Sequence, residues 1–163
     1  MRRIISVIIF ISIHLGLCAQ DDPMSYFIGK WDFKVWFAGN TNTKPDLKAL
    51  WTLEKSVGNN FDAHGKVVVE DKGETTKEQM GFDKAKGLYF RTVTASEGLF
   101  FFTSSGWKGN KLTWEGYLVP MSDERVPMKE EITKISANEF HAVFYKKQGD
   151  SWEVVTREEL KRN

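Results

Sequence analysis

The sequence predicts an all-β protein, a single up-and-down antiparallel β-barrel of about ten strands preceded by a short helical turn. Three observations predict this class. Glycines recur every few residues between positions 39 and 116, which suits tight turns. The short segments between them are rich in aromatic and β-branched residues, which favour a pleated sheet. Turn signals recur at roughly 8–12-residue spacing, as in β-barrels and β-sandwiches, and no amphipathic helix is indicated after residue 30.

The first strand, at 31–37, has the clearest alternation, which predicts one buried face. That face carries Trp31, Phe33, Val35 and Phe37. Residues 24–28, just before it, are expected to form the helical turn. Strands at 47–57 and 61–71 follow, the second broken by a bulge at Gly65. The remaining strands are predicted at 75–83, 88–95, 99–105, 111–118, 128–136, 138–146 and 151–160.

A consecutive set of about ten strands has to close or fold over, because open sheet edges invite aggregation. Hairpin-sized connections favour an up-and-down barrel, whose lumen is lined by alternate residues. A sandwich of two sheets is the alternative.

The N-terminus has the pattern of a secretory signal peptide over residues 1–19. Arg2 and Arg3 precede an almost wholly apolar run at 4–17, and Ala19 offers a cleavage position. Residues 20–163 are then the mature domain, exported to the periplasm or the extracellular space. Cys18 offers an alternative, as the lipidated first residue of a bacterial lipoprotein, but Leu17 before it is larger than that chemistry favours.

Composition narrows the range of partners. Cleavage after Ala19 removes Arg2 and Arg3 and no acid, which leaves 21 basic against 22 acidic residues and a net charge of −1. With no basic stripe, no nucleic-acid partner is expected. No later segment approaches the length of a membrane span, so no stable membrane insertion is expected. The mature chain would have no cysteine, so its core alone would hold it together.

Three segments carry a resemblance to a known family. Residues 27–31 read Phe-Ile-Gly-Lys-Trp, residues 81–83 read Gly-Phe-Asp, and a glycine-rich hairpin spans 106–112. This pattern resembles the calycins, which include the lipocalins, and more closely a calycin-like family of unknown function. It covers nearly all of residues 20–163. The resemblance implies a barrel opened by Gly29 and Trp31, in which Trp31 packs against a basic side chain from a late strand. Arg157 is the expected partner, and an exposed Arg157 is the alternative.

The resemblance and the aromatic content together predict a small apolar or amphipathic ligand inside the barrel. Arg91 shares a strand face with Tyr89 and Val93. If that face points inward, Arg91 could bind a ligand carboxylate, as in fatty-acid-binding relatives of this architecture; otherwise it lies on a solvated face. The candidate ligand-binding residues are Phe33, Val35, Trp51, Tyr89, Arg91, Phe102, Trp114, His141 and Tyr145.

No catalytic residue, metal site or cofactor is predicted, because no catalytic motif or metal-ligand spacing is present. A calycin relative binds haem through a barrel histidine, but no other feature supports that role for His141. Two alternatives to a binding protein stay open. One is an isomerase or hydrolase on the same barrel, in which an acid or His141 meets Arg91. The other is an envelope interaction protein with a filled barrel, which a cluster of Trp36, Phe101 and Trp107 on the outer face would favour.

Overall fold

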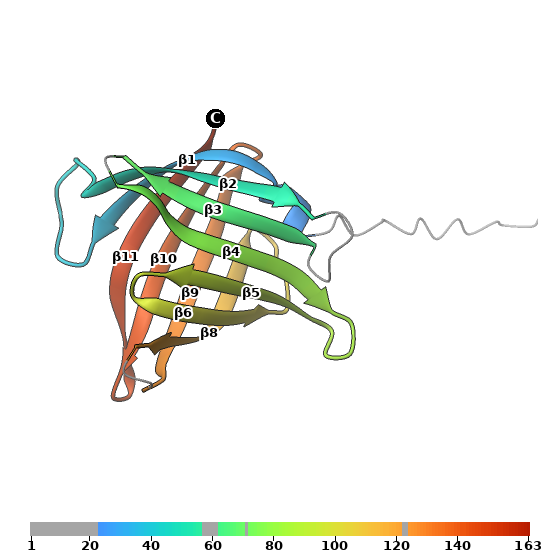
Figure 1. Cartoon of the computed structure of the whole chain (residues 1–163). Helices are drawn as coiled ribbons and strands as arrows, with labels where there is room; N and C mark the ends of the chain where they lie inside the picture. Colours follow the sequence, from blue (N-terminus) through green and yellow to red (C-terminus); the bar gives the residue numbers. More distant parts are fainter. Residues whose placement is uncertain (1–22, 57–61, 71, 122–123) are drawn as a thin grey trace, which may run out of the picture.

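The computed structural model of the chain describes residues 23–56, 62–70, 72–121 and 124–163. The predicted signal peptide and Cys18 lie outside these residues. Ten strands of the described chain form a closed antiparallel up-and-down barrel, with one 3-10 turn before them (Figure 1). The elements are η1 (Pro23–Tyr26), β1 (Gly29–Phe37), β2 (Leu47–Lys55), β3 (Ala63–Val69), β4 (Gly73–Asp83), β5 (Leu88–Ala95), β6 (Gly98–Ser104), β7 (Trp107–Lys108), β8 (Lys111–Pro120), β9 (Val126–Ser136), β10 (Glu139–Gln148) and β11 (Ser151–Arg162).

The predicted class and all ten predicted strands are confirmed, with ends that shift by a few residues. The sequence did not predict β7, which has two residues and pairs only with the start of β8. The bulge expected at Gly65 is wrong, because the register between β3 and β4 shifts between Val67 and Val68. Gly65 serves close packing instead: a Cβ there would lie 2.7 Å from the Leu53 side chain and 2.7 Å from the Thr52 carbonyl oxygen.

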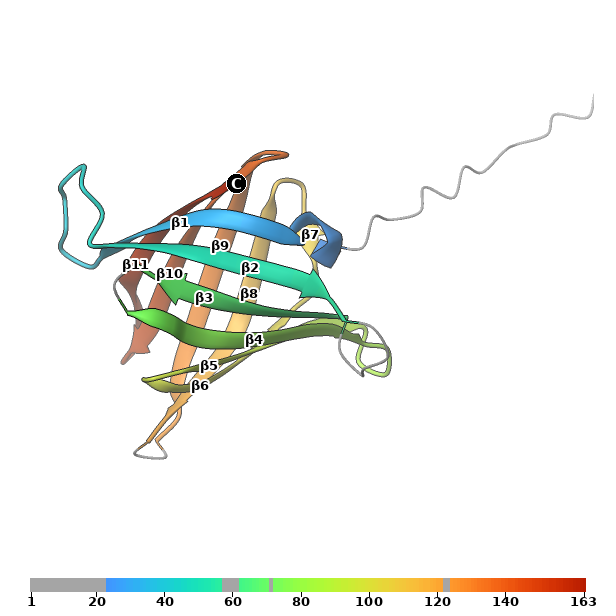
Figure 2. The ribbon, with the colours of Figure 1, turned by 45° about the horizontal axis from the view of Figure 1, so that its top comes forward.

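Pairing between β6 and β8 closes the barrel and excludes the two-sheet sandwich. Gly116 on β8 lies opposite Phe102 at this seam. A Cβ at Gly116 would overlap the carbonyl oxygen of Phe101, so the two strands pair this closely only because the residue is glycine. In Figure 2, strands β1 to β4 cross β8 to β11 at a steep angle, as in a strongly coiled small barrel.

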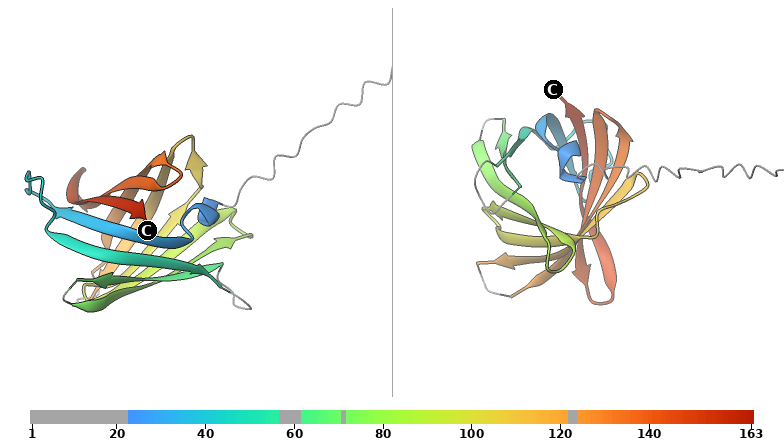
Figure 3. Two further views of the ribbon diagram at one scale, coloured as in Figure 1. Left: turned by 90° about the horizontal axis from the view of Figure 1, so that it is seen from above. Right: turned by 90° about the vertical axis from the view of Figure 1, so that its right-hand side faces the viewer.

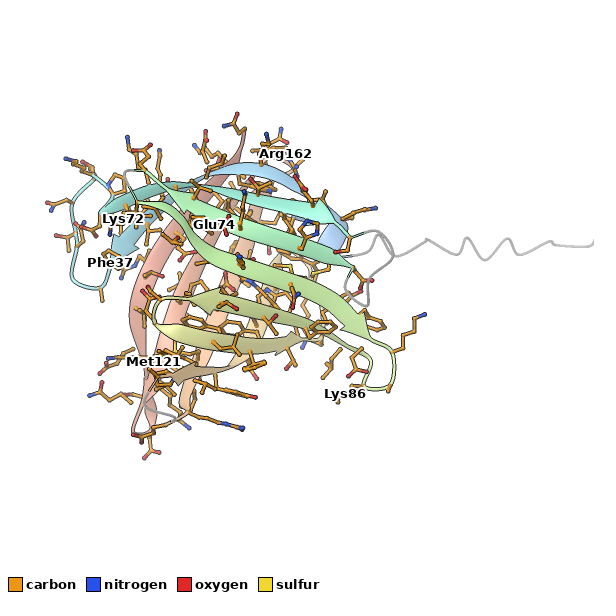
Figure 4. All side chains as sticks on the ribbon, in the orientation of Figure 1. Phe37, Lys72, Glu74, Lys86, Met121 and Arg162 are labelled. Carbon is orange, nitrogen blue, oxygen red and sulfur yellow. The ribbon has the colours of Figure 1, made fainter. Side chains whose placement is uncertain are left out.

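Alternate residues of each strand line the lumen, where the apolar core forms. The turn η1 lies at one end of the ring of strands (Figure 3), and we call this the plugged end. Aromatic rings fill it: Phe27 stacks on Trp107 with 5.7 Å between ring centroids, and Trp31 meets Phe140 edge to face at 4.9 Å. Phe37, Lys72 and Met121, labelled in Figure 4, mark the opposite end, which we call the far end.

Arg162, not Arg157, is the basic side chain that packs on Trp31, so the expected role of Arg157 is wrong. The guanidinium carbon of Arg162 lies 4.2 Å from the centre of the Trp31 ring. Its Nη1 and Nη2 donate hydrogen bonds to the carbonyls of Ile28 and Tyr26, at 2.7 and 2.9 Å. The register pairs Trp31 with Arg162, whereas Arg157, five positions away, faces the outside and is exposed.

The contact between Arg162 and Trp31 fastens η1 to the barrel. Trp31 adds a hydrogen bond from its Nε1 to the Phe27 carbonyl at 2.8 Å. Tyr26 donates its hydroxyl to the carbonyls of Ser136 and Glu139, at 2.9 and 3.1 Å. Burial raises the pKa of Tyr26 to about 12, against the opposing effect of Arg162, so the hydroxyl stays a donor. The plugged end is therefore tied across the first and last strands of the barrel.

Candidate functional site

A layer of charged side chains crosses the lumen between the plugged end and the far end. Arg91 on β5 donates from Nη1 to Glu130 Oε2 on β9 at 2.5 Å, and from Nη2 to Glu78 Oε1 on β4 at 3.0 Å. The three residues are 8%, 3% and 4% exposed, in the order Arg91, Glu130, Glu78. Charged residues are rarely buried to this degree unless paired. The two ion pairs therefore join the neighbouring strands β4 and β5 to β9, which lies across the lumen.

Glu158 on β11 is the fourth member of this layer and, among the described residues, the only one of its three acids without a hydrogen bond from Arg91. Its Oε1 accepts a hydrogen bond from the hydroxyl of Thr156 at 3.0 Å. Its side chain has intermediate exposure and lies close enough to Arg91 and Glu130 to interact electrostatically with both. We call Glu78, Arg91, Glu130 and Glu158 the charged layer. It contains three carboxyl groups for one guanidinium.

A cavity of about 30 Å³ lies against the charged layer on the side of the plug. All four residues of the layer border it, together with Trp51 from β2 and apolar side chains such as Phe33 and Val67. One water-sized group needs about 10–15 Å³, so the cavity has room for the polar head of a small molecule but not for a whole one.

Three buried polar atoms around this cavity have no hydrogen-bond partner among the described atoms: Trp51 Nε1, Arg91 Nε and Glu78 Oε2. A buried donor or acceptor without a partner costs about 1–3 kcal/mol, and native structures contain few of them. Three on side chains that border one cavity indicate a place where a polar group can bind. Trp114 Nε1 is also unpartnered, but Trp114 does not border the cavity.

Two acids of the charged layer, Glu130 and Glu158, have pKa values that are raised toward neutral pH. Burial raises the pKa of Glu130 to about 7, despite the opposing effect of Arg91. Burial, with a further contribution from the charge of Glu130, raises the pKa of Glu158 to about 8. Burial alone would lower the pKa of Arg91, but Glu130 and Glu78 outweigh it and raise the pKa, so Arg91 stays charged. Such shifts are common at functional sites and also occur in structural ion-pair networks.

Seven of the nine candidate ligand-binding residues lie on strand faces that point into the barrel. The alternative left open for Arg91 is resolved as inward, together with Tyr89. Of the seven, Phe33, Trp51 and Arg91 border the cavity. The inward-facing candidates are Phe33, Val35, Trp51, Tyr89, Arg91, Phe102 and Trp114.

His141 and Tyr145 are corrections, because both point away from the lumen. His141 lies between the inward-facing Phe140 and Ala142 on β10, and its Nε2 contacts Glu139 Oε1 at 3.2 Å. Tyr145 follows an irregularity in the pairing of β10 and donates its hydroxyl to Glu131 at 3.2 Å. Both residues occupy outward-facing positions of β10, so neither side chain reaches the lumen.

The sequence reading missed Glu78, Glu130 and Glu158. A signal was available, since each acid is two positions from a buried apolar residue on the same strand face. Glu78 precedes Met80 by two positions, and Glu158 precedes Leu160 in the same way. An acid in the apolar phase of a strand indicates a buried carboxyl group, and three of them on different strands indicate a cluster.

The outer surface offers less to a ligand with an apolar body. A hollow of about 500 Å³ over β2 to β5 is lined almost wholly by polar residues, such as Glu54, His64 and Lys77. The aromatic cluster that would favour an interaction protein does not form. Trp107 packs in the plug. Trp36 lies on β1 and Phe101 on β6, and four strands of the sheet separate β1 from β6.

Comparisons with known proteins assign no family. No protein-family model matches the chain, and a search of curated proteins finds no match either. Within the ranges that the structure describes, no group of three or more His, Cys, Asp or Glu side chains could hold a metal ion. No helix among the described residues is long and apolar enough to cross a membrane.

Proposed function

We propose that this protein is an exported, calycin-like barrel that binds a small amphipathic molecule in its lumen. The observation that carries the proposal is the set of unpartnered polar atoms on Trp51, Arg91 and Glu78, which border one cavity in an otherwise apolar interior. A barrel evolved only for stability would gain by replacing buried ion pairs with well-packed apolar residues. Keeping four ionisable groups there is better explained by recognition of a ligand.

The far end supplies contacts for the apolar body of such a ligand. Phe100, Leu118, Val126 and Phe144 point inward from β6, β8, β9 and β10, and all four are only partly buried. Burial of apolar surface yields about 25 cal/mol per Å². A ligand with its head at the charged layer and its body among these side chains would be stabilised at both ends.

The expected bond between Arg91 and a ligand carboxylate lacks support. Both terminal nitrogens of Arg91 already donate to carboxylates of the protein. A ligand carboxylate would therefore have to compete with Glu78 and Glu130 for the guanidinium.

Export is proposed on the pattern of residues 1–19 alone, with cleavage after Ala19 and lipidation of Cys18 as the competing outcome. Intact mass of the protein purified from its own host separates them. A mature chain that begins at Gln20 supports cleavage by the ordinary route, and a diacylglycerol adduct on Cys18 supports the anchored form. An unprocessed chain in the cytoplasm contradicts export.

Nile red, an apolar fluorescent dye, tests the binding function. We expect the dye to bind the wild-type barrel with a stoichiometry near one and with blue-shifted emission. Val67→Phe should fill the cavity and weaken binding at least about tenfold, because the added volume has no other space to occupy. Val68→Phe is the matched control, since Val68 is the next residue on β3 and faces outward. Absence of dye binding, or equal loss in both variants, would contradict the proposal.

One observation favours the alternative of an enzyme on the same barrel: a carboxyl group that titrates near neutral pH lies in contact with Arg91. Such a group could transfer protons. Turnover of small ester or enolisable ketone substrates that disappears in Glu130→Gln, with folding intact, would support this alternative. Turnover that is unchanged in that variant would contradict it.

A further inference from the structure

We propose that the cavity selects the hydroxyl head of an uncharged amphipathic alcohol and discriminates against a carboxylate or an ammonium head on the same alkyl chain. This inference rests on the proposed binding function and specifies which head the lumen accepts. Three properties of the cavity support this selection: the hydrogen-bonding groups at its border, the charges around it and its size.

The unpartnered atoms at the cavity are two donors and one acceptor. Trp51 Nε1 and Arg91 Nε each carry one hydrogen to donate. Glu78 accepts from Arg91 through Oε1, and its Oε2 is the unpartnered acceptor. A hydroxyl group has two acceptor lone pairs and one hydrogen. A hydroxyl group therefore carries one matching partner for each of the three atoms.

Charged heads satisfy these atoms less well. A carboxylate could accept from Trp51 and Arg91, but it has no hydrogen for Glu78 Oε2, and it would have to share Arg91 with Glu78 and Glu130. An ammonium group could donate to Glu78, but it has no acceptor for Trp51 or Arg91 and its charge opposes that of the guanidinium. Unpaired buried groups would remain in both complexes, and each lowers the affinity.

The state of the acids agrees with an uncharged head. Glu130 and Glu158 have raised pKa values, so below neutral pH both largely carry protons. In that state neither acid supplies a negative charge that would favour a cationic head. The cavity of about 30 Å³ also suits a hydroxyl group with its first carbon better than a bulkier head.

Displacement of Nile red by decanol, decanoate and decylamine at pH 7 tests the inference, because the three differ only in their heads. We expect decanol to compete at least about tenfold more strongly than either charged compound. The variant Trp51→Phe removes one donor at the cavity and should weaken decanol about three- to tenfold. Trp114→Phe is the matched control, since Trp114 is also buried and also has an unpartnered Nε1, but does not border the cavity.

The outcomes separate the two proposals. If the dye does not bind, the proposed function fails. If the dye binds but the three compounds displace it equally, or decanoate displaces it best, the function stands and the selection of a hydroxyl head is wrong. Equal weakening of decanol by Trp51→Phe and Trp114→Phe also overturns the inference. Circular dichroism checks that both variants fold, and the comparison of heads on the wild-type protein does not depend on either variant.

Discussion

Two arginines point into this barrel, and their surroundings differ. Arg162 at the plugged end lies on the Trp31 ring and donates to two backbone carbonyls, all of them uncharged. Arg91 in the charged layer contacts two carboxylates, lies near a third and keeps one nitrogen unpartnered. The first arrangement closes the end of a barrel with its polar groups satisfied. The second leaves polar groups unsatisfied beside a cavity, which suits binding rather than closure.

Replacing Arg91 should have the largest effect on stability. Arg91→Leu leaves the buried Glu78 and Glu130 without their positive partner, and loss of one partner of a buried pair costs about 3–5 kcal/mol. The loss of stability should be smaller at pH 5 than at pH 8, because a protonated acid is uncharged and is not stabilised by the positive charge of the guanidinium. Urea unfolding at the two pH values measures it. A loss below 1 kcal/mol at pH 8 would mean that the charged layer is not buried as described.

The second-largest expected effect is the dependence of the free energy of unfolding on pH. The pKa values of Glu130 and Glu158 rise from 4.5 to about 7 and about 8 on folding, so the folded chain binds more protons than the unfolded chain over this interval. The stabilisation that these two acids contribute to the free energy of unfolding is therefore complete below about pH 4.5, and it is lost as the pH rises through 7 and 8. Arg91 and Glu78 are the other charged groups of the layer that act on both acids.

Glu158→Gln mimics the protonated acid and should remove much of this loss. We expect the variant to be more stable than the wild type at pH 9, by an amount on the order of 3 kcal/mol. Glu159→Gln, on the outer face of the same strand, is the control and should leave the pH profile unchanged. Two identical profiles would contradict the burial of Glu158.

Replacing Arg162 should destabilise the barrel by a smaller amount and without this pH dependence. Arg162→Leu removes the contact with Trp31 and the hydrogen bonds to Tyr26 and Ile28, a loss of about 2 kcal/mol. Because none of these partners titrates between pH 5 and 8, the loss should be equal at both values. A loss that grows with pH would show that the two arginines do not differ in the way described.

Arg157 should matter least, although the family resemblance pointed to it. Its side chain is exposed on the outer face, so Arg157→Ala should change the free energy of unfolding by less than about 0.5 kcal/mol. Thermal unfolding of this variant beside Arg162→Leu compares the two positions directly. A large effect at Arg157 and none at Arg162 would reverse the assignment.

The fold was predictable because each strand can be recognised from the residues of its own segment. Alternation from Trp31 to Phe37 gave both the strand and its inward face, and glycine turns gave the strand order of an up-and-down barrel. The partner of Trp31 was not predictable in the same way. Arg157 and Arg162 lie on one strand with opposite phase, and the phase depends on the register with β1, which no local pattern supplies.

The site was only half predictable, for a related reason. Arg91 was identified as an inward candidate from its neighbours on β5, whereas Glu130 and Glu158 were not recognised. Both acids belong to adjacent pairs, at 130–131 and 158–159, and adjacent strand residues face opposite ways. That rule is correct, and it implies that one acid of each pair faces inward. Whether three such acids meet one arginine depends on the curvature of the closed sheet, which arises from the whole barrel.

The central claim is that Trp51, beside the charged layer, contacts the head of a bound ligand. The indole N–H signals of the six tryptophans in a nitrogen-15-labelled sample test it directly during titration with decanol. We predict that the Trp51 signal shifts in step with saturation, as its Nε1 gains an acceptor, while the Trp114 signal stays in place. A Trp51 signal that does not move while decanol displaces the dye would contradict the account.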